Sequence, residues 1–475
     1  MSAKRNRQIL WLAVLIQATI SGFAQSTATI NWTNVHQVID GFGASNEDWS
    51  SSMSSAHQGF FFGTGTGQIG LSILRAGLPN NSQEIGDCTS VGTSCAGAVV
   101  GDMQAIVANG GRVAAAPWSP PAAYTYGNAT FCASGNSQLN TASYGAYATW
   151  FSNFAQSLAA QGVPLYAVSI QNEPDQCQSY DSSEWSGSTI DTFIKSNLGP
   201  ALSSLSSPPL IFMPEPSANS LLSNYGATCA GDSSCYNYVS GVNFHDYGAS
   251  ISSPGSAPAE PFPSGWGAKK YWETEVSCGS GYGPGGVCPG GFNTSISNAL
   301  DWATLIDQRL QDGANAWLYW QLIDFNQSGG AGTSSDGSLM ANAASGYTVP
   351  LRTYALGQYA HFIRPGYYRI DATHVPQSGV TVSAYQQTSS NTLVIVATNY
   401  TGSSVSQTFN ITNSPTFTTL TPTITSASQS LAQLSNVSVS GNSFTYTLPA
   451  QSITTFVGST ASIPPPTNLT GTVIQ

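Results

Sequence analysis

The chain has 475 residues and a net charge of −11, and only 7% of its residues are charged, against about 25% in an average domain. An acidic chain without a basic face argues against nucleic acid and anionic membrane surfaces as partners. None of its histidines and cysteines shows metal-ligand spacing, so no metal site and no cofactor are expected.

The N-terminus has the pattern of a secretion signal. Basic residues between Lys4 and Arg7 precede a mostly apolar stretch from Ile9 to Ile20, and Gly22-Phe23-Ala24 fits a cleavage site. This apolar stretch is too short to cross about 30 Å of hydrocarbon. We therefore expect residues 1–24 to be a signal peptide and the mature protein to be a secreted monomer, either extracellular or periplasmic.

Eight cysteines in an exported chain predict disulfides. Three pairs are close in sequence and lie in Gly/Ser-rich stretches, where they would close local loops, which leaves one pair to bridge two separate loops. Other pairings stay open, because spacing does not fix connectivity. The expected pairs are Cys88–Cys95, Cys132–Cys177, Cys229–Cys235 and Cys278–Cys288.

Eight short apolar runs, each followed by a helix-like or loop segment, lie between residues 36 and 360. Strands that alternate with helical patterns favour a parallel sheet, and eight such units fit an α/β fold of the (β/α)8 TIM barrel type. The helical pattern is clearest after Thr141, and Gly162 stands where a C-terminal cap is expected. The runs are Val38–Gly43, Ile69–Arg75, Arg112–Trp118, Leu165–Glu173, Leu210–Glu215, Val242–Tyr247, Lys270–Glu275 and Ala314–Gln321.

Most of these runs end on a polar or aromatic residue. In a TIM barrel the C-terminal strand ends converge on one face, where active sites lie. Strands that end at the surface would explain one or two polar residues, but not a set so rich in Glu, Trp and His. The set is Arg75, Trp118, Glu173, Glu215, His245, Tyr247, Glu275 and Trp320.

From about Pro365 the pattern changes to short, alternating, β-branched runs, which predict an attached antiparallel β-sandwich. The early run Ala28–Trp32 is expected to join it. The expected domains are the barrel at 36–360, the β-sandwich at 25–35 plus 361–459, and a Pro-containing linker or tail at 460–475. The later runs are Val380–Tyr385, Thr392–Thr398, Ser406–Ile411, Asn436–Val439 and Ser443–Leu448.

Two of the chain's eight glutamates, Glu173 and Glu275, end the fourth and seventh runs. Proline disfavours helical backbone in the residue before it, so Pro174 should keep Glu173 extended and pointing into the cleft. Hydrolysis of a glycosidic bond with retention needs two carboxyl groups about 5–5.5 Å apart, which facing strand tips can provide. The alternative is a pair of surface glutamates that cap helices.

At these residues the chain resembles glycoside hydrolase family 30, especially its bacterial xylanase branch. The resemblance covers nearly the whole mature sequence and implies that Glu173 is the acid/base, that Glu275 is the nucleophile and that Asn172 contacts the sugar 2-hydroxyl. It also implies a −1 subsite lined by Trp118, His245, Tyr247 and Trp320. The matching segments are 37–43, 116–121, 168–175, 272–275, 362–372 and 448–456.

Glu273 competes for the nucleophile role, because strand alternation puts it on the same face as Glu275. The family motif Trp-x-Thr-Glu selects Glu275, and the family usually has an apolar residue where this chain has Glu273. Glu215, at the end of the fifth run, either orients the pair or is a buried structural partner. We expect Arg75 to anchor a carboxylate rather than to bind substrate.

Family members that depend on a glucuronate branch carry basic residues just after the eighth strand. Here no Lys or Arg lies between Arg309 and Arg352, and Asp324 occupies that stretch. A glucuronate carboxylate cannot form bidentate charge-assisted bonds without an arginine. We therefore expect a retaining endo-β-1,4-xylanase that acts on plant cell-wall xylan and does not depend on glucuronate.

Two alternatives remain open. The first is a family member that acts on another β-glycan, as a β-1,6-glucanase or a xylobiose-releasing exo-enzyme. The second is a non-catalytic carbohydrate-binding protein on a barrel scaffold. The loops that would decide specificity, Asn46–Gly63 and Gln327–Ser345, have no decisive signature.

Overall fold

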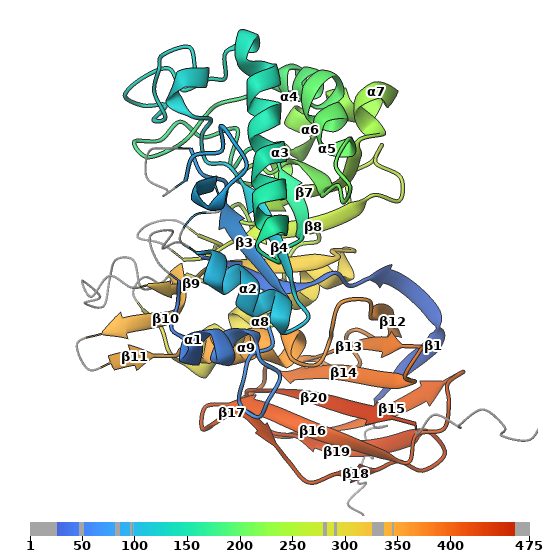
Figure 1. Ribbon diagram of the computed structural model, residues 1–475. Helices are drawn as coiled ribbons and strands as arrows, with labels where there is room; N and C mark the ends of the chain where they lie inside the picture. The colour runs from blue at the N-terminus through green and yellow to red at the C-terminus, as the bar shows by residue number, and fades with distance from the viewer. Residues whose placement is uncertain are drawn as a thin grey trace, which may run out of the picture.

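The computed structural model describes residues 26–46, 52–80, 86–95, 97, 99–278, 283–288, 292–324, 337–343 and 346–460. The expected signal peptide and residues 461–475 of the expected tail lie outside this range. A barrel ringed by helices stands beside a β-sandwich (Figure 1). Within the described residues, no helix combines the length and apolar character that a membrane crossing requires.

The first sheet closes into a barrel of eight parallel strands. Neighbouring strands pair in chain order, and β9 pairs with both β8 and β2, which closes the ring. Each strand overlaps one of the predicted runs, so the TIM barrel is confirmed. The strands are β2 (Gly41–Ser45), β3 (Ile73–Gly77), β4 (Arg112–Ala116), β5 (Leu165–Ser169), β6 (Leu210–Pro214), β7 (Val239–His245), β8 (Lys270–Glu275) and β9 (Ala316–Asp324).

Helices cover the outside of the barrel. The pattern after Thr141 forms α3, and Gly162 follows its end with φ +81°, a left-handed conformation that glycine adopts readily. Two short strands, β10 (Ser338–Ala343) and β11 (Gly346–Thr348), extend the sheet beyond β9. The helices are α1 (Ser55–Phe62), α2 (Val100–Ala108), α3 (Tyr144–Ala160), α4 (Gly187–Phe193), α5 (Gly199–Ser203), α6 (Leu222–Gly231), α7 (Ser233–Tyr236), α8 (Ile296–Gln311) and α9 (Leu351–Ala360).

The second sheet folds around an apolar core that includes Ile30, Ile395 and Phe456. Its pairs are antiparallel except for β1 with β15, which run parallel. The early run Ala28–Trp32 falls in β1, which therefore belongs to this sheet. The strands are β1 (Thr27–Val38), β12 (Tyr368–Ala372), β13 (Val380–Gln387), β14 (Thr392–Asn399), β15 (Val405–Thr412), β16 (Thr419–Ser426), β17 (Gln429–Gln433), β18 (Val437–Ser438), β19 (Ser443–Leu448) and β20 (Ser452–Ser459).

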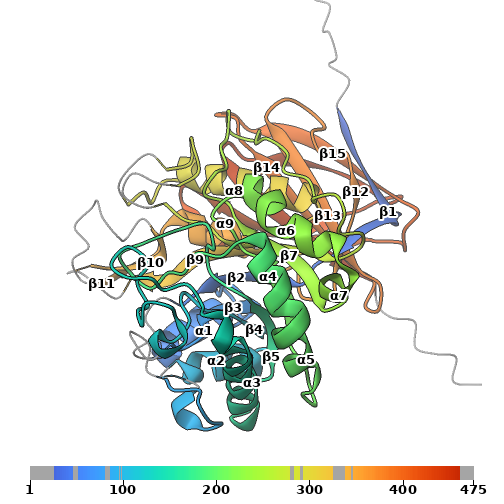
Figure 2. The same ribbon diagram turned by 90° about the horizontal axis from the view of Figure 1, so that it is seen from above.

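Helices α8 and α9 lie on the side of the barrel that faces the sandwich, and α3 lies on the opposite side (Figure 2). The contact includes a hydrogen bond from Thr455 Oγ1 to the Gln358 carbonyl and a 2.6 Å contact between His374 Nε2 and Asp307 Oδ2. The candidate site lies at the C-terminal ends of the barrel strands.

Candidate active site

Glu173 and Glu275 meet at the C-terminal ends of the barrel strands. Glu173 lies four residues beyond the end of β5, and Glu275 is the last residue of β8. A carboxylate oxygen of each residue and a ring nitrogen of His245 all lie within 4.8 Å of one another. Two carboxyl groups and an imidazole therefore face one another across the mouth of the barrel.

Glu173 does not have the expected extended backbone. Its φ is +45°, in the left-handed region, although proline was expected to keep the preceding residue extended. The backbone N–H of Glu173 donates to the Glu215 carbonyl at 3.1 Å, and the Glu173 carbonyl accepts from the Gln176 N–H at 2.9 Å. These two hydrogen bonds stabilise a sharp turn, and such strained conformations are concentrated at functional sites.

The carboxylate of Glu275 is held from two sides. Arg75 Nη1 donates to Glu275 Oε2 at 2.7 Å, and the Tyr247 hydroxyl donates to Oε1 at 2.8 Å. Both hydrogen bonds suit an ionised carboxylate, which can only accept. The carboxyl group is thus fixed in orientation before any ligand binds.

Arg75 connects several of the predicted residues. Its guanidinium donates to Glu215 Oε1 at 3.1 Å and to Asn172 Oδ1 at 2.6 Å, and it lies 4.7 Å from the centre of the Trp118 ring. Burial alone would raise the pKa of Glu215, but Arg75 and His245 outweigh it and lower this pKa to about 2. Arg75 therefore anchors carboxylates, as expected, and Glu215 is a buried anion.

His245 lies among three carboxyl groups. Its Nδ1 is 2.9 Å from Glu173 Oε1 and 3.6 Å from Glu275 Oε1, and its Nε2 is 3.7 Å from Glu215 Oε1. Burial lowers the pKa of His245, but the charge of Glu275 and the contacts with Glu173 and Glu215 raise it to about 10. The imidazole is consequently protonated at neutral pH, so Nδ1 donates to Glu173.

The environment of Glu173 differs from that of Glu275. Burial is the largest cause that raises the pKa of Glu173, and the charges of Glu275 and Asp175 raise it further, against the opposing effect of His245. The result is a pKa above the ordinary value. A protonated Glu173 lies beside Glu275, whose carboxylate accepts two hydrogen bonds. This arrangement allows acid–base chemistry.

The Trp118 ring lies against Arg75 and beside a second tryptophan ring. The Trp118 and Trp320 rings lie 5.7 Å apart, and the backbone N–H of Trp320 donates to the Val276 carbonyl. Flat apolar rings of this kind stack on sugar faces. The contacts thus link all seven predicted site residues: Trp118, Asn172, Glu173, His245, Tyr247, Glu275 and Trp320.

Glu273 lies on the other side of the strand from the pair. Trp272 and Ala316, which pair across β8 and β9, belong to the apolar cluster inside the barrel, and the next pair is Glu273 with Trp317, so Glu273 faces outward. The pairing register of β7 with β8 shifts between Phe244/Glu273 and His245/Glu275. The expectation that alternation puts Glu273 and Glu275 on one face is therefore wrong, because a bulge interrupts the alternation.

Two further contacts were not predicted. Ser45, at the end of β2, accepts from Arg75 Nη1 at 3.2 Å, and the buried Gln171 donates to the Trp118 carbonyl at 2.6 Å. Gln171 lies beside Asn172 and Glu173, which was a usable signal. Ser45 has no such signal, because only the folding of β2 against β3 brings it to Arg75.

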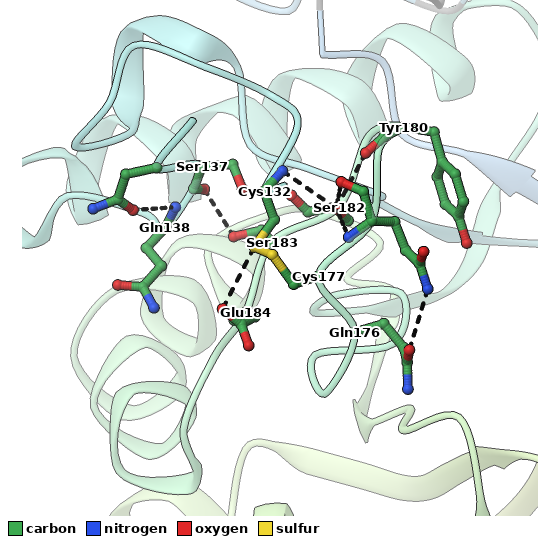
Figure 3. Close-up of a disulfide and its surroundings, with 11 residues drawn as sticks. Cys132, Ser137, Gln138, Gln176, Cys177, Tyr180, Ser182, Ser183 and Glu184 are labelled. Carbon is green, nitrogen blue, oxygen red and sulfur yellow. Dashed lines mark hydrogen bonds between the residues drawn. A yellow bond between two sulfur atoms is a disulfide. The ribbon is translucent and has the colours of Figure 1, made fainter. Parts of the chain in front are cut away.

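All four expected disulfides are present. Cys132–Cys177 joins the loop after β4 to the loop after Glu173 (Figure 3). Around it, Ser137 Oγ donates to the Ser182 carbonyl at 2.5 Å, and Ser183 Oγ donates to the Ser137 carbonyl at 2.8 Å. The loops that follow Trp118 and Glu173 are thus tied together.

Among the described residues, three clusters have the donor atoms that a metal ion needs. Two of them use disulfide-bonded cysteines, Cys132 with Cys177 and Cys229 with Cys235, whose sulfur atoms are not thiolates. In the third, formed by Glu173, His245 and Glu275, protonated His245 and Arg75 already supply positive charge. The arrangement fits acid–base chemistry better than cation binding.

Comparisons with known proteins agree with this architecture. Residues 102–363 match the family described as Glycosyl hydrolase family 30 TIM-barrel domain. The chain is 30% identical over 445 residues to glucuronoxylanase XynC of Bacillus subtilis (strain 168), and the match covers 91% of this chain and 92% of that protein.

Solved structures extend the similarity. Xyn30A, a glycoside hydrolase family 30 subfamily 8 xylanase from Clostridium acetobutylicum, has a TM-score of 0.73 and 31% identity, and covers 91% of this chain and 100% of its own. A family 30 endoxylanase from Clostridium papyrosolvens C71 has a TM-score of 0.71 and 30% identity, with coverage of 92% and 100%. This protein is a glycoside hydrolase, and its chain belongs to glycoside hydrolase family 30.

Proposed function

We propose that this protein is a secreted, retaining endo-β-1,4-xylanase in which Glu173 is the acid/base and Glu275 is the nucleophile. The observation that carries the proposal is the pair of carboxyl groups at facing strand ends, with one oxygen of Glu173 within 4.8 Å of one oxygen of Glu275. Retaining enzymes hold their two carboxyl groups about 5–5.5 Å apart, whereas inverting enzymes leave about 6.5–9.5 Å for a water molecule. The short separation supports double displacement.

The contacts of the two glutamates support the division of roles. Glu275 accepts hydrogen bonds from Arg75 and Tyr247, which favour the anion that attacks the anomeric carbon. Burial and neighbouring charges raise the pKa of Glu173, which favours the protonated form that must donate to the leaving oxygen. The same residue then deprotonates the water that releases the sugar from Glu275.

The remaining site residues fit substrate binding. Arg75 occupies the amide oxygen of Asn172, so Asn172 can offer its NH2 group to a sugar hydroxyl. Trp118 and Trp320 provide faces for stacking, and His245 and Tyr247 orient the two carboxyl groups. No step of this chemistry requires a cofactor.

Xylan is the substrate that the relatives favour. The Bacillus subtilis relative is named a glucuronoxylanase, and both clostridial structures are named as xylanases. We propose that this chain cuts the same β-1,4-linked backbone but does not require the glucuronate branch. Arg309 and Arg352, the basic residues on either side of the post-β9 stretch in sequence, are both buried and hydrogen-bonded. Residues 325–336 of that stretch lie outside the described residues.

Secretion, the monomeric state and the domain boundaries belong to the same proposal. Four disulfides fit an oxidising compartment. The signal peptide at 1–24 and the tail at 460–475 are proposed from sequence. The division between the barrel at 36–360 and the sandwich at 25–35 plus 361–459 would place the first boundary within β1.

Digestion of a panel of β-glycans, with mass spectrometry of the products, tests this proposal. We expect unsubstituted and arabinose-decorated β-1,4-xylan to be cut internally at least as well as glucuronoxylan, with retention of anomeric configuration by NMR. If every product carried one glucuronate at a fixed position from its reducing end, independence from glucuronate would be wrong. Preferential cleavage of a β-1,6-glucan, or release of xylobiose alone, would refute the endo-xylanase.

A further inference from the structure

Glu273 is a buried acidic side chain that the proposed chemistry does not use. Its exposed fraction is 0%. Its Oε1 accepts the backbone N–H of Glu275 at 3.0 Å, and its Oε2 accepts the backbone N–H of Leu318 at 3.0 Å. One carboxyl group therefore binds the main chain of Glu275 on β8 and the main chain of β9.

These two contacts lie where the pairing of β8 with β9 is interrupted. The ladder pairs Trp272 with Ala316 and Glu273 with Trp317, and beyond it the Trp320 N–H donates to the Val276 carbonyl. Glu275 lies in this interval. The carboxyl group of Glu273 spans it by accepting one N–H from each strand.

The edge of β8 that pairs with β7 is also irregular, because it contains a bulge. The register with β7 shifts between Glu273 and Glu275, and bulges redirect side chains at the cost of regular pairing. The Asp246 N–H donates to the Glu275 carbonyl at 3.1 Å, which fixes the main chain of Glu275 from the β7 side. Glu273 fixes it from the β9 side.

We propose that Glu273 is a positioning residue that holds the main chain of Glu275 against β9, so that the carboxyl group of Glu275 meets the anomeric carbon in line. The role rests on the proposed assignment of Glu275 as nucleophile. Misplacement of a reacting group by about 1 Å can cost about 100-fold in rate. An apolar residue at 273 cannot accept either N–H.

A direct catalytic role for Glu273 does not fit its contacts. Glu273 faces outward from the barrel, and both of its carboxyl oxygens already accept backbone N–H groups. Burial, followed by the charge of Asp246, raises its pKa well above the ordinary value, which is unsuited to an ionised nucleophile. The effect of Glu273 on the reaction must therefore pass through the backbone of Glu275.

The test compares Glu273→Met, which accepts neither N–H, with Glu273→Gln, which keeps the shape and one carbonyl oxygen. The substrate is a dinitrophenyl β-xylobioside. The 2-deoxy-2-fluoro analogue with the same leaving group labels the nucleophile, and its labelling rate measures formation of the covalent intermediate alone. For Glu273→Met we expect kcat and the labelling rate to fall by about 10- to 100-fold with KM unchanged. The kcat and labelling rate of Glu273→Gln should lie between those of Glu273→Met and the wild type.

Asp307→Asn is the matched control, because Asp307 is also a buried carboxylate but contacts His374 near the sandwich. It should lower the melting temperature without changing kcat. If Glu273→Met has the kcat of the wild type and only a lower melting temperature, or if Asp307→Asn loses as much kcat as Glu273→Met, the positioning role is wrong.

Two outcomes keep this inference separate from the proposed function. If Glu273→Met does not fold, Glu273→Gln decides, and a kcat and labelling rate equal to the wild type would overturn the role. If the wild type cleaves no xyloside, or if the fluoro sugar labels a residue other than Glu275, the proposed function fails first, and the positioning role fails with it.

Discussion

Replacement of Glu173 by alanine separates the two halves of the proposed reaction. The carboxyl group of Glu173 accepts from His245 Nδ1 at 2.9 Å and lies within 4.8 Å of a Glu275 oxygen, whereas Arg75 and Tyr247 hold Glu275 independently of Glu173. Glu173→Ala should therefore remove the proton donor and leave the attacking carboxylate in place.

The size of the effect should depend on the leaving group. General acid catalysis contributes about 100- to 10,000-fold, which corresponds to about 3–5 kcal/mol of barrier. A xylan or nitrophenyl leaving group, which needs protonation, should suffer this full loss in kcat/KM. A dinitrophenyl leaving group needs no proton, so its kcat/KM should change little, while kcat becomes limited by slow release of the sugar from Glu275.

Azide and pH complete the assay. Azide needs no general base and fits the space of the deleted carboxyl group, so it should raise kcat of Glu173→Ala on the dinitrophenyl substrate and yield a β-xylobiosyl azide. Because the pKa of Glu173 is raised, kcat/KM of the wild type should fall as pH rises through that pKa, and the variant should lack this fall. Equal losses on all leaving groups with no response to azide would refute the acid/base role.

Two further predictions follow from neighbouring residues. Glu275→Gln should abolish turnover on every leaving group with an unchanged circular dichroism spectrum; activity in Glu275→Gln together with inactivity in Glu273→Gln would reverse the assignment. Glu260 is a partly buried carboxyl group whose Oε1 lies 3.3 Å from Arg309 Nη2. Burial and the charge of Asp246 outweigh Arg309 and raise the pKa of Glu260 from 4.5 to about 8, so its contribution to stability should be present below pH 4.5 and lost as pH rises to 8. As pH rises over this range, the melting temperature of Glu260→Gln should accordingly fall less than that of the wild type. Parallel curves of melting temperature against pH for the two proteins would contradict this.

Much of the site could be predicted because barrel topology does the assembly. Once eight runs are recognised as parallel strands, their C-terminal ends must meet, so Glu173, His245 and Glu275 come together without knowledge of any contact. The disulfides could be predicted in a similar way. Three cysteine pairs close short loops, which left Cys132 and Cys177 to bridge the loops after β4 and β5.

The local backbone at the strand tips was not predictable in this way. The left-handed turn at Glu173 depends on a hydrogen bond to the carbonyl of Glu215, which comes from another strand. The bulge in β8 likewise depends on the register with β7. Period-2 alternation describes a regular strand, and both errors occurred where tertiary contacts override local preference.

The sandwich shows a different limit. Strands β12, β16, β17 and β20 were not among the predicted runs. Thr419–Ser426 in β16 consists largely of Thr and Ser and carries little hydrophobic contrast. The parallel pairing of β1 with β15 joins segments more than 370 residues apart, from Thr27/Thr408 onward. Nothing in either segment alone specifies a parallel partner over an antiparallel one.

The charges of the site explain why its proton can cycle. Arg75 and protonated His245 supply two positive charges, and Glu215, with its pKa near 2, supplies one permanent negative charge. With Glu275 ionised, these four charges sum to zero, so the site as a whole is neutral only if Glu173 keeps its proton. Formation of the ester on Glu275 removes one negative charge, and Glu173 can then ionise and restore neutrality. Burial continues to raise the pKa of Glu173, but the repulsion from Glu275 is gone, so the residue that was an acid in the first step becomes a base in the second.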